Sequence, residues 1–159
     1  MYETDEKWAE EGDAFHTVEL TNTAGVTFKA ALGICMDINP YKFEDSSKFE
    51  LADYCKEQKI DALFLSCNWI DSDPKKQGQT AIMETINYWI YRLHKLLEDQ
   101  KDKTRYSRRW GFFCVNRVGK EGETTFTGSS CAVRVNPLQL IGSLDKKSEG
   151  FLCAEMNLV

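Results

Sequence analysis

The sequence predicts one α/β domain, and three observations carry this prediction. The chain has 159 residues, which is the usual length of a single domain. Its 42% apolar and 28% charged residues are ordinary for a folded globular protein and exclude collagen or wholesale disorder. Segments with the alternation of strands and segments with the spacing of helices follow one another along the chain, which is typical of α/β proteins.

The first half of the chain supplies two strands and a helix. Residues 25–36 predict a strand, because apolar residues recur at nearly every second position, and Ala31, which interrupts this alternation, indicates burial on both faces. Ser47 and Glu50 have the spacing of a capping box, which indicates a helix that ends near Gln58. The short apolar run 60–65 is typical of a central strand.

The second half begins with a helix and continues with strands. Apolar residues at steps of three and four predict an amphipathic helix over residues 78–99. Residues 110–115 and 124–135 favour strands, with a Gly-rich turn between them. We expect residues 138–144 and 150–158 to pair as a closing hairpin.

The charge pattern bears on partners and location. The net charge of −5 gives the chain no global attraction to nucleic acid or anionic lipid. Five bases gather in residues 101–109, where a solvated loop is favoured over a nucleic-acid contact. No apolar stretch is long enough to span a bilayer, and the acidic start does not resemble a signal peptide. We therefore expect no nucleic-acid or membrane partner and a cytoplasmic location, with the nucleus as an alternative.

The six cysteines do not predict a metal centre. No two of them have the close spacing of zinc ligands, and only two histidines are present, so we expect no metal and no cofactor. A domain of this length without a secretory signal does not need disulfides. Most of the six are interpreted as buried thiols that pack as small apolar side chains. They are Cys35, Cys55, Cys67, Cys114, Cys131 and Cys153.

Cys35 has a position that suits chemistry. It stands at the carboxyl end of the predicted strand 25–36, just before a turn. In open α/β sheets, reactive groups gather at that edge. A thiol placed there can act as a nucleophile when a base or a cation lowers its pKa. From position alone, a packing role for Cys35 remains an open alternative.

The residues around Cys35 resemble a known family. The sequence Gly-Ile-Cys-Met-Asp at 33–37 resembles the nucleophile segment of the nitrilase superfamily, the carbon–nitrogen hydrolases. Residues 116–130 resemble its late motif of a strand, a turn and a second strand. The start of the chain, Tyr-Glu-Thr-Asp-Glu-Lys-Trp at 2–8, and residues 33–43 more specifically resemble the fungal protein N-terminal asparagine amidohydrolases. Members of that group deamidate the amino-terminal Asn, and often Gln, of proteins and so mark them for degradation.

The resemblance implies roles for residues of this chain. Cys35 would form a thioester with the substrate carboxamide, and the backbone N–H of Met36 would donate to the oxyanion. Glu6 would orient a catalytic Lys, with Glu3 as an alternative and a solvated acidic run as the plain interpretation. The resemblance also implies residues that bind the substrate. Two of them have a structural role as an alternative, because Asp37 can stabilise the turn and Trp69 can serve in packing. These candidates are Asp37, Asn68 and Trp69.

The chain also departs from the family pattern. The family's general-base Glu and its Lys both precede the segment where this sequence begins. Residues 1–159 are therefore expected to form the C-terminal portion of a nitrilase-type α-β-β-α sandwich, a partial domain. Unpaired strands and an uncovered sheet face would favour a homo-oligomer. Two alternatives stay open, namely a catalytically incomplete remnant with an interaction role and a redox-reactive thiol protein.

Overall fold

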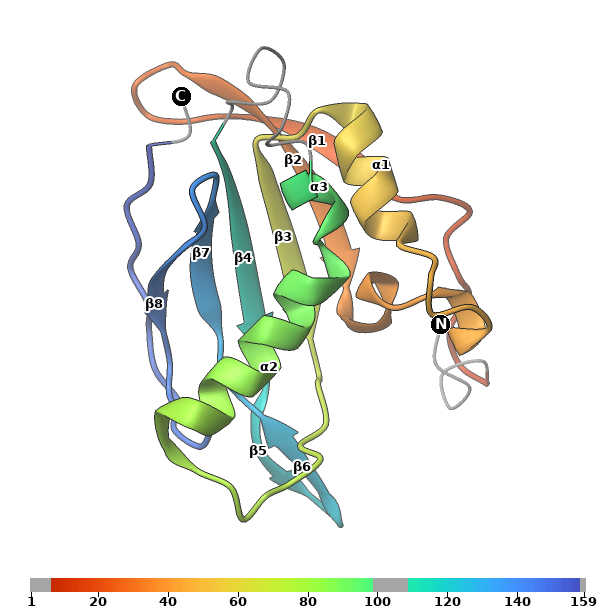
Figure 1. The fold of residues 1–159 in the computed structure, drawn as a ribbon, viewed down its shortest axis with the longest axis vertical. Coiled ribbons are helices and arrows are strands. Elements are labelled where there is room, and N and C mark those ends of the chain that lie inside the picture. The colour runs from red at the N-terminus through yellow and green to blue at the C-terminus, as the bar shows by residue number, and fades with distance from the viewer. Residues whose placement is uncertain (1–6, 99–108, 158–159) are drawn as a thin grey trace.

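A six-stranded mixed sheet with helices on one face forms the fold (Figure 1). The computed structural model describes residues 7–98 and 109–157. The sheet has the order β1-β2-β3-β4-β7-β8, in which β2, β3 and β4 run parallel and the other neighbours pair antiparallel. Its strands are β1 (His16–Thr21), β2 (Thr27–Ile34), β3 (Ala62–Cys67), β4 (Trp110–Asn116), β7 (Cys131–Val135) and β8 (Gln139–Ser143).

The remaining elements lie around this sheet. A two-stranded hairpin, β5 and β6, extends beyond the end of β4 (Figure 1). Two short 3₁₀ helices follow β2, and three α-helices cover one sheet face. These elements are β5 (Val118–Glu121), β6 (Thr124–Thr127), η1 (Cys35–Ile38), η2 (Tyr41–Phe43), α1 (Glu50–Gln58), α2 (Gly78–Arg92) and α3 (Lys95–Glu98). The α/β class predicted from the sequence is confirmed.

Four expectations about the elements are wrong, three of them about the helices and the C-terminal hairpin. Ser47 does not cap α1, because its hydroxyl bonds the neighbouring Asp45 carboxylate at 2.6 Å and the helix begins after Phe49. The helix predicted over 78–99 divides at Leu93, where the backbone leaves helical geometry. Residues 150–157 form no strand, and the partner of β8 is β7.

The strand predicted over 124–135 also divides in two. Gly128 and Ser129 have positive φ values of 53° and 60°, which end β6 before β7 begins. A Cβ at Gly128 would lie 2.6 Å from the carbonyl oxygen of Lys146, so this position requires a glycine for space as well as for backbone conformation. The break allows β6 to pair with β5 while β7 joins the main sheet.

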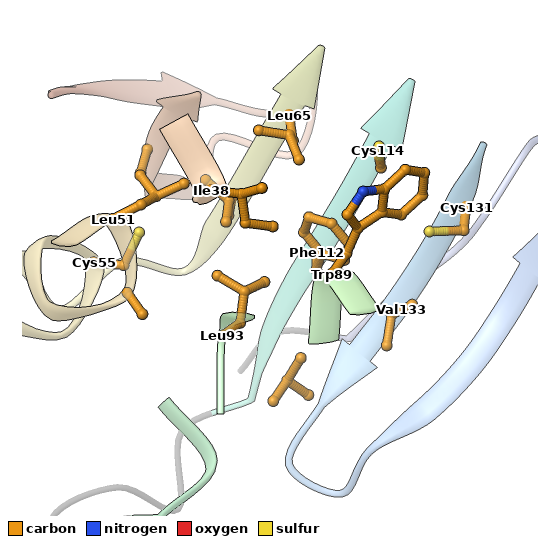
Figure 2. Close-up of a cluster of buried hydrophobic side chains, with 14 of the residues drawn as sticks. Ile38, Leu51, Cys55, Leu65, Trp89, Leu93, Phe112, Cys114, Cys131 and Val133 are labelled. Atoms are coloured by element: carbon orange, nitrogen blue, oxygen red, sulfur yellow. The ribbon is translucent and has the colours of Figure 1, made fainter. Parts of the chain in front are cut away.

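The core lies between the helices and the sheet (Figure 2). Trp89 of α2 and Phe112 of β4 are fully buried and meet edge to face with ring centroids 6.5 Å apart. Burial of a large apolar side chain contributes about 1.5–3 kcal/mol, so each of these side chains stabilises the packing of the helices on the sheet. The larger buried members of the cluster are Leu51, Leu63, Leu65, Ile86, Trp89, Leu93, Phe112, Val133 and Val135.

The opposite sheet face is apolar and partly open to solvent. Ile34 is 70% exposed and Val115 is 69% exposed on this face. The rings of Phe64 and Phe113 stack here at 5.1 Å. Met156 of the C-terminal segment packs near Gly111, but within residues 7–98 and 109–157 no helix covers this face. None of the helices in these ranges is long and apolar enough to cross a membrane.

Candidate functional site

Cys35 lies at the carboxyl end of β2, where the sequence predicts it. It is partly buried, and it begins η1 with a φ of 39°. A positive φ in a residue with a side chain is strained, and such strain is maintained only by the surrounding structure. Ile34 of β2 pairs with Ser66 of the parallel strand β3, so Cys35 and Cys67, the next residue of each chain segment, come side by side.

The contacts of the Cys35 sulfur set its acidity. Its thiol hydrogen-bonds with the Cys67 thiol, and this bond together with burial raises the pKa of Cys35 well above the ordinary value. The Asn68 backbone N–H at the same sulfur acts in the opposite direction, and the Asp37 carboxylate adds to the rise in this pKa. Among the described residues, no cation is one of the main causes of the shift in this pKa. The Cys35 thiol is therefore protonated at neutral pH in this arrangement.

Cys67 connects Cys35 with the core. Its sulfur lies 3.9 Å from that of Cys114 on β4, so three sulfurs line the ends of three adjacent strands. Cys55, Cys67, Cys114 and Cys131 are buried, which confirms the packing interpretation for these four. Sequence reasoning missed Cys67 as a neighbour of Cys35. The signal that could have identified it is its position at the end of the next predicted strand.

The turn after Cys35 is closed by its own residues. Asp37 accepts a hydrogen bond from the backbone N–H of Ile34 at 2.8 Å, so its carboxylate stabilises the turn. The carbonyl oxygen of Met36 accepts from the N–H of Asn39 at 2.9 Å. The roles predicted for Met36 in the oxyanion hole and for Asp37 in substrate binding stay predictions.

Asn68 and Trp69 follow β3 on the other side of Cys35. The side chain of Asn68 is exposed beside the site. Trp69 is half-buried, with ring centroids 5.6 Å from Tyr88 and 6.0 Å from Trp89. Its backbone N–H donates to the Asn116 side-chain oxygen at 2.8 Å, which fixes the chain as it leaves the strand. Trp69 thus packs against the two aromatic rings of α2, and its role in substrate binding stays a prediction.

Arg92 at the end of α2 holds the segment that follows the Cys35 turn. Its buried guanidinium donates to the carbonyl oxygens of Ile38 at 3.0 Å and Ser46 at 3.1 Å, and also to that of Lys48. The same group lies over the Phe49 ring, 4.2 Å from its centroid. The apolar pattern that predicts this helix from the sequence does not predict the hydrogen bonds of Arg92 to the segment after the Cys35 turn.

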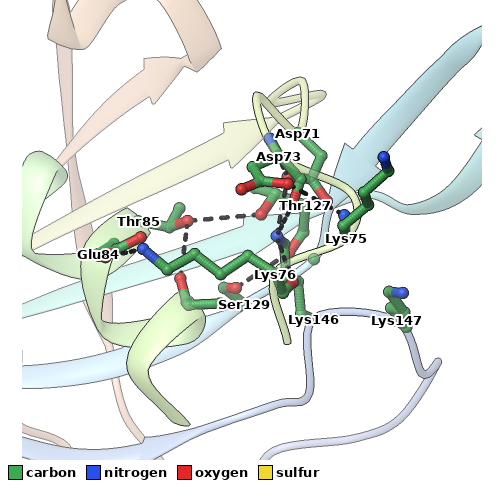
Figure 3. Close-up of polar contacts among 12 residues, drawn as sticks. Asp71, Asp73, Lys75, Lys76, Glu84, Thr85, Thr127, Ser129, Lys146 and Lys147 are labelled. Atoms are coloured by element: carbon green, nitrogen blue, oxygen red, sulfur yellow. Dashed lines mark hydrogen bonds and ion pairs between the residues drawn. The ribbon is translucent and has the colours of Figure 1, made fainter. Parts of the chain in front are cut away.

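A second buried cation fixes the loop that leaves the site. Lys146 donates to the Asp71 carboxylate at 2.8 Å and to the carbonyl oxygens of Asp73 and Lys76 at 2.9 and 3.0 Å (Figure 3). Because the ammonium has three protons, these acceptors use all of its donors. The loop between β3 and α2 is thereby tied to the segment that follows β8.

Several predicted residues lie outside the described ranges. These are Glu6, its alternative Glu3, and residues 101–108 of the basic run. Among the residues that the structure describes, no group of three or more side chains could hold a metal ion.

The chain is similar in sequence to two curated proteins, whereas no protein-family model matches it. It is 29% identical to "Protein N-terminal amidase" of Schizosaccharomyces pombe over 171 aligned residues, which cover 98% of this chain and 56% of the relative. It is 30% identical to the protein of the same name from Saccharomyces cerevisiae over 95 residues, or 50% of this chain and 21% of the relative. The chain thus spans about half the length of the first of these relatives.

Solved structures share the fold. A crystal structure of an N-terminal amidase with an Asn-Glu-Ala peptide matches with a TM-score of 0.74 and 18% identity, over 92% of this chain and 67% of that one. An amidase from Nesterenkonia sp. AN1, with an acrylamide adduct on its active-site cysteine, matches with a TM-score of 0.56 and 14% identity, over 92% and 45%. The predicted fold, a portion of the sandwich found in nitrilase-type amidases, is confirmed.

Proposed function

We propose that this chain, which resembles the protein N-terminal amidases and shares the fold of nitrilase-type amidases, is an amidohydrolase. Its substrate would be the N-terminal Asn or Gln of a protein or peptide, and its product would direct that protein to degradation. The observation that carries the proposal is the placement of Cys35, in a strained turn at the sheet edge with the Asn68 N–H at its sulfur. The match to a protein N-terminal amidase over 98% of the chain supports it.

The reaction would divide one difficult hydrolysis into two steps. The Cys35 sulfur loses its proton and attacks the carboxamide carbon, while the N–H of Met36 donates to the developing oxyanion. The carbon–nitrogen bond breaks, the leaving nitrogen takes up a proton, and ammonia departs to leave a thioester. Water then hydrolyses the thioester, which yields the carboxylic acid and returns the thiol.

The first step needs a base and a cation. The raised pKa keeps the thiol of Cys35 protonated at neutral pH, and no described cation is among the main causes that shift this pKa. We propose that a Glu base and a Lys from outside the described residues complete the site, with Glu6 orienting the Lys. Residues 1–159 would then form one portion of a complete catalytic domain.

Recognition of the substrate would involve the residues that border the sulfur. The exposed Asn68 side chain can bind the carboxamide or the free ammonium, and Trp69 can line the pocket beside it. The Asp37 carboxylate supplies negative charge toward the ammonium while it holds the turn. With such a substrate we place the protein in the cytoplasm or the nucleus, with neither nucleic acid nor a membrane as partner.

The proposal is tested by ammonia release from synthetic peptides that begin with Asn or Gln. We expect release from a free Asn terminus, no release from the N-acetylated peptide, and loss of release in Cys35→Ala. Cys153→Ala removes an exposed cysteine and is the matched control that should retain activity. Equal release by the Cys35→Ala variant would overturn the proposal.

A second candidate function is a catalytically incomplete remnant that serves in protein interaction. The raised pKa of Cys35, whose main causes are the Cys67 thiol and burial, favours this alternative. The two candidates differ in one readout. Release of ammonia would exclude the remnant, whereas a cooperatively folded protein that carries the proposed Glu and Lys together with residues 1–159 and still releases no ammonia between pH 6 and 9 would support the remnant and exclude the amidase.

A further inference from the structure

A helix residue that the proposed reaction does not use reaches the Cys35 turn. The hydroxyl of Tyr88, on α2, donates to the side-chain oxygen of Asn39 at 2.5 Å. Asn39 is buried and ends the turn that Cys35 begins, whereas Tyr88 is 40% exposed at the surface of the helix. The bond therefore joins the outer helix layer to the loop that carries the nucleophile.

Asn39 holds Met36 from two sides. Its backbone N–H donates to the Met36 carbonyl oxygen at 2.9 Å, and its amide nitrogen lies 3.7 Å from the Met36 sulfur. Met36 is the residue whose N–H would donate to the oxyanion. Since the turn starts from the strained backbone of Cys35, contacts of this kind are needed to keep it in one conformation.

Tyr88 also contacts the other side of the site. Its ring lies 5.6 Å from the ring of Trp69, which follows Cys67 and Asn68 at the end of β3. One side chain thus touches the turn after β2 and the segment after β3. These two segments bring the oxyanion donor of Met36 and the N–H of Asn68 to the Cys35 sulfur, so their spacing determines the geometry of attack.

We propose that Tyr88, acting through Asn39, is a positioning residue that fixes the Met36 peptide relative to the Cys35 sulfur. This inference rests on the proposed amidase function for its catalytic meaning, but the geometry that it describes can be measured separately. Small misplacements at a reacting centre can cost up to about 100-fold in rate. The loss of a single hydrogen bond accounts for only a part of such a rate loss. When the bond between Tyr88 and Asn39 is removed, we expect kcat to fall about tenfold and KM to change less than about twofold.

The test removes only the hydroxyl, in Tyr88→Phe, which retains the ring contact with Trp69. The matched control is Tyr91→Phe on the same helix, whose ring stacks on His94 rather than on the site. Hydrogen exchange of the peptide that contains residues 34–39 and the alkylation rate of Cys35 by iodoacetamide report the turn. We expect both to change severalfold in Tyr88→Phe and to stay at the wild-type values in Tyr91→Phe.

A second pair of variants tests the route through Asn39. Asn39→Ala removes the acceptor of the Tyr88 hydroxyl together with the amide contact to the Met36 sulfur, so its effect should be at least as large as that of Tyr88→Phe. The double variant Tyr88→Phe/Asn39→Ala should be no worse than Asn39→Ala alone, because Asn39→Ala already removes the bond that Tyr88→Phe removes. Additive effects would show that Tyr88 does not act through Asn39.

The outcomes separate this inference from the proposed function. If a protein that carries the proposed Glu and Lys with residues 1–159 releases no ammonia while exchange and alkylation respond as expected, the amidase proposal fails and the positioning contact stands. If the wild type deamidates peptides and Tyr88→Phe has wild-type kcat, exchange and alkylation, the positioning role is refuted. A lowered melting temperature with unchanged exchange at residues 34–39 would also refute it, since it would show a purely structural bond.

Discussion

The buried ammonium of Lys146 allows a quantitative prediction about the loop that follows the candidate site. Lys146→Met retains the apolar stem but removes the charge and the hydrogen bonds to three acceptors. The Asp71 side chain, only 3% exposed, would be left buried without its cation. Removing one partner of a buried ion pair costs about 3–5 kcal/mol. For a domain of this length, that corresponds to a fall in melting temperature on the order of 10 °C.

The assay is urea denaturation followed by tryptophan fluorescence, with calorimetry for the melting temperature. Lys76→Met is the matched control, because Lys76 pairs with Glu84 through side chains that are 42% and 54% exposed. Exposed pairs contribute about 0–1 kcal/mol, so this control should stay close to wild type. The double variant Lys146→Met/Asp71→Leu removes both buried charges and should recover part of the loss.

Two results would refute this reasoning. One is a Lys146→Met variant that loses no more stability than Lys76→Met. The other is a double variant less stable than Lys146→Met alone, which would show that the packing around Asp71, rather than its unpaired charge, determines the cost.

Three further predictions concern the cysteines and the open sheet face. Cys67→Ala removes the main cause of the raised pKa of Cys35. The alkylation rate of Cys35 at neutral pH should therefore rise about tenfold for each unit by which that pKa falls. An unchanged alkylation rate would contradict this prediction. Burial raises the pKa of Cys55 from 9.0 to about 12, so the folded state keeps a proton that the unfolded chain loses as the pH rises above 9. The free energy of unfolding, measured in urea, should therefore fall between pH 8 and pH 10. Cys55→Ala lacks this contribution, so its free energy of unfolding should fall by about 1.4 kcal/mol less than that of the wild type. Val115→Lys places a charge on the open apolar face and should reduce self-association, as measured by light scattering. The control Leu138→Lys changes an exposed position in the β7–β8 connection and should leave self-association unchanged. A monomeric wild type would show that the expected homo-oligomer is wrong.

The elements with a strong apolar period could be predicted from the sequence. The run 60–65 corresponds to β3 at the centre of the sheet, and the long periodic segment contains α2. Strand β1 was not predicted, because it lies at the edge of the sheet and most of its residues are exposed. The capping pattern at Ser47 failed because Asp45, two residues earlier, competes for the same hydroxyl.

The place of the candidate nucleophile could also be predicted, but its surroundings could not. Cys35 follows an alternating strand, and that pattern indicates a sheet edge. Which residues meet it depends on the pairing of β2 with β3, and periodicity does not reveal how strands align. The contact with Cys67, which raises the pKa of Cys35, therefore emerges only from the structure. The same holds for Tyr88, whose hydroxyl lies 49 positions along the chain from its acceptor.

The proposed reaction depends on a thioester between the Cys35 sulfur and the carbonyl carbon of a carboxamide substrate. The most direct measurement is a rapid acid quench of the chain with a peptide that begins with Asn, followed by mass spectrometry of the fragment that contains Cys35. We predict an adduct on Cys35 with the mass of the peptide less one ammonia, which hydroxylamine removes. Ammonia release with no adduct on Cys35, or with the adduct on a different cysteine, would contradict the account.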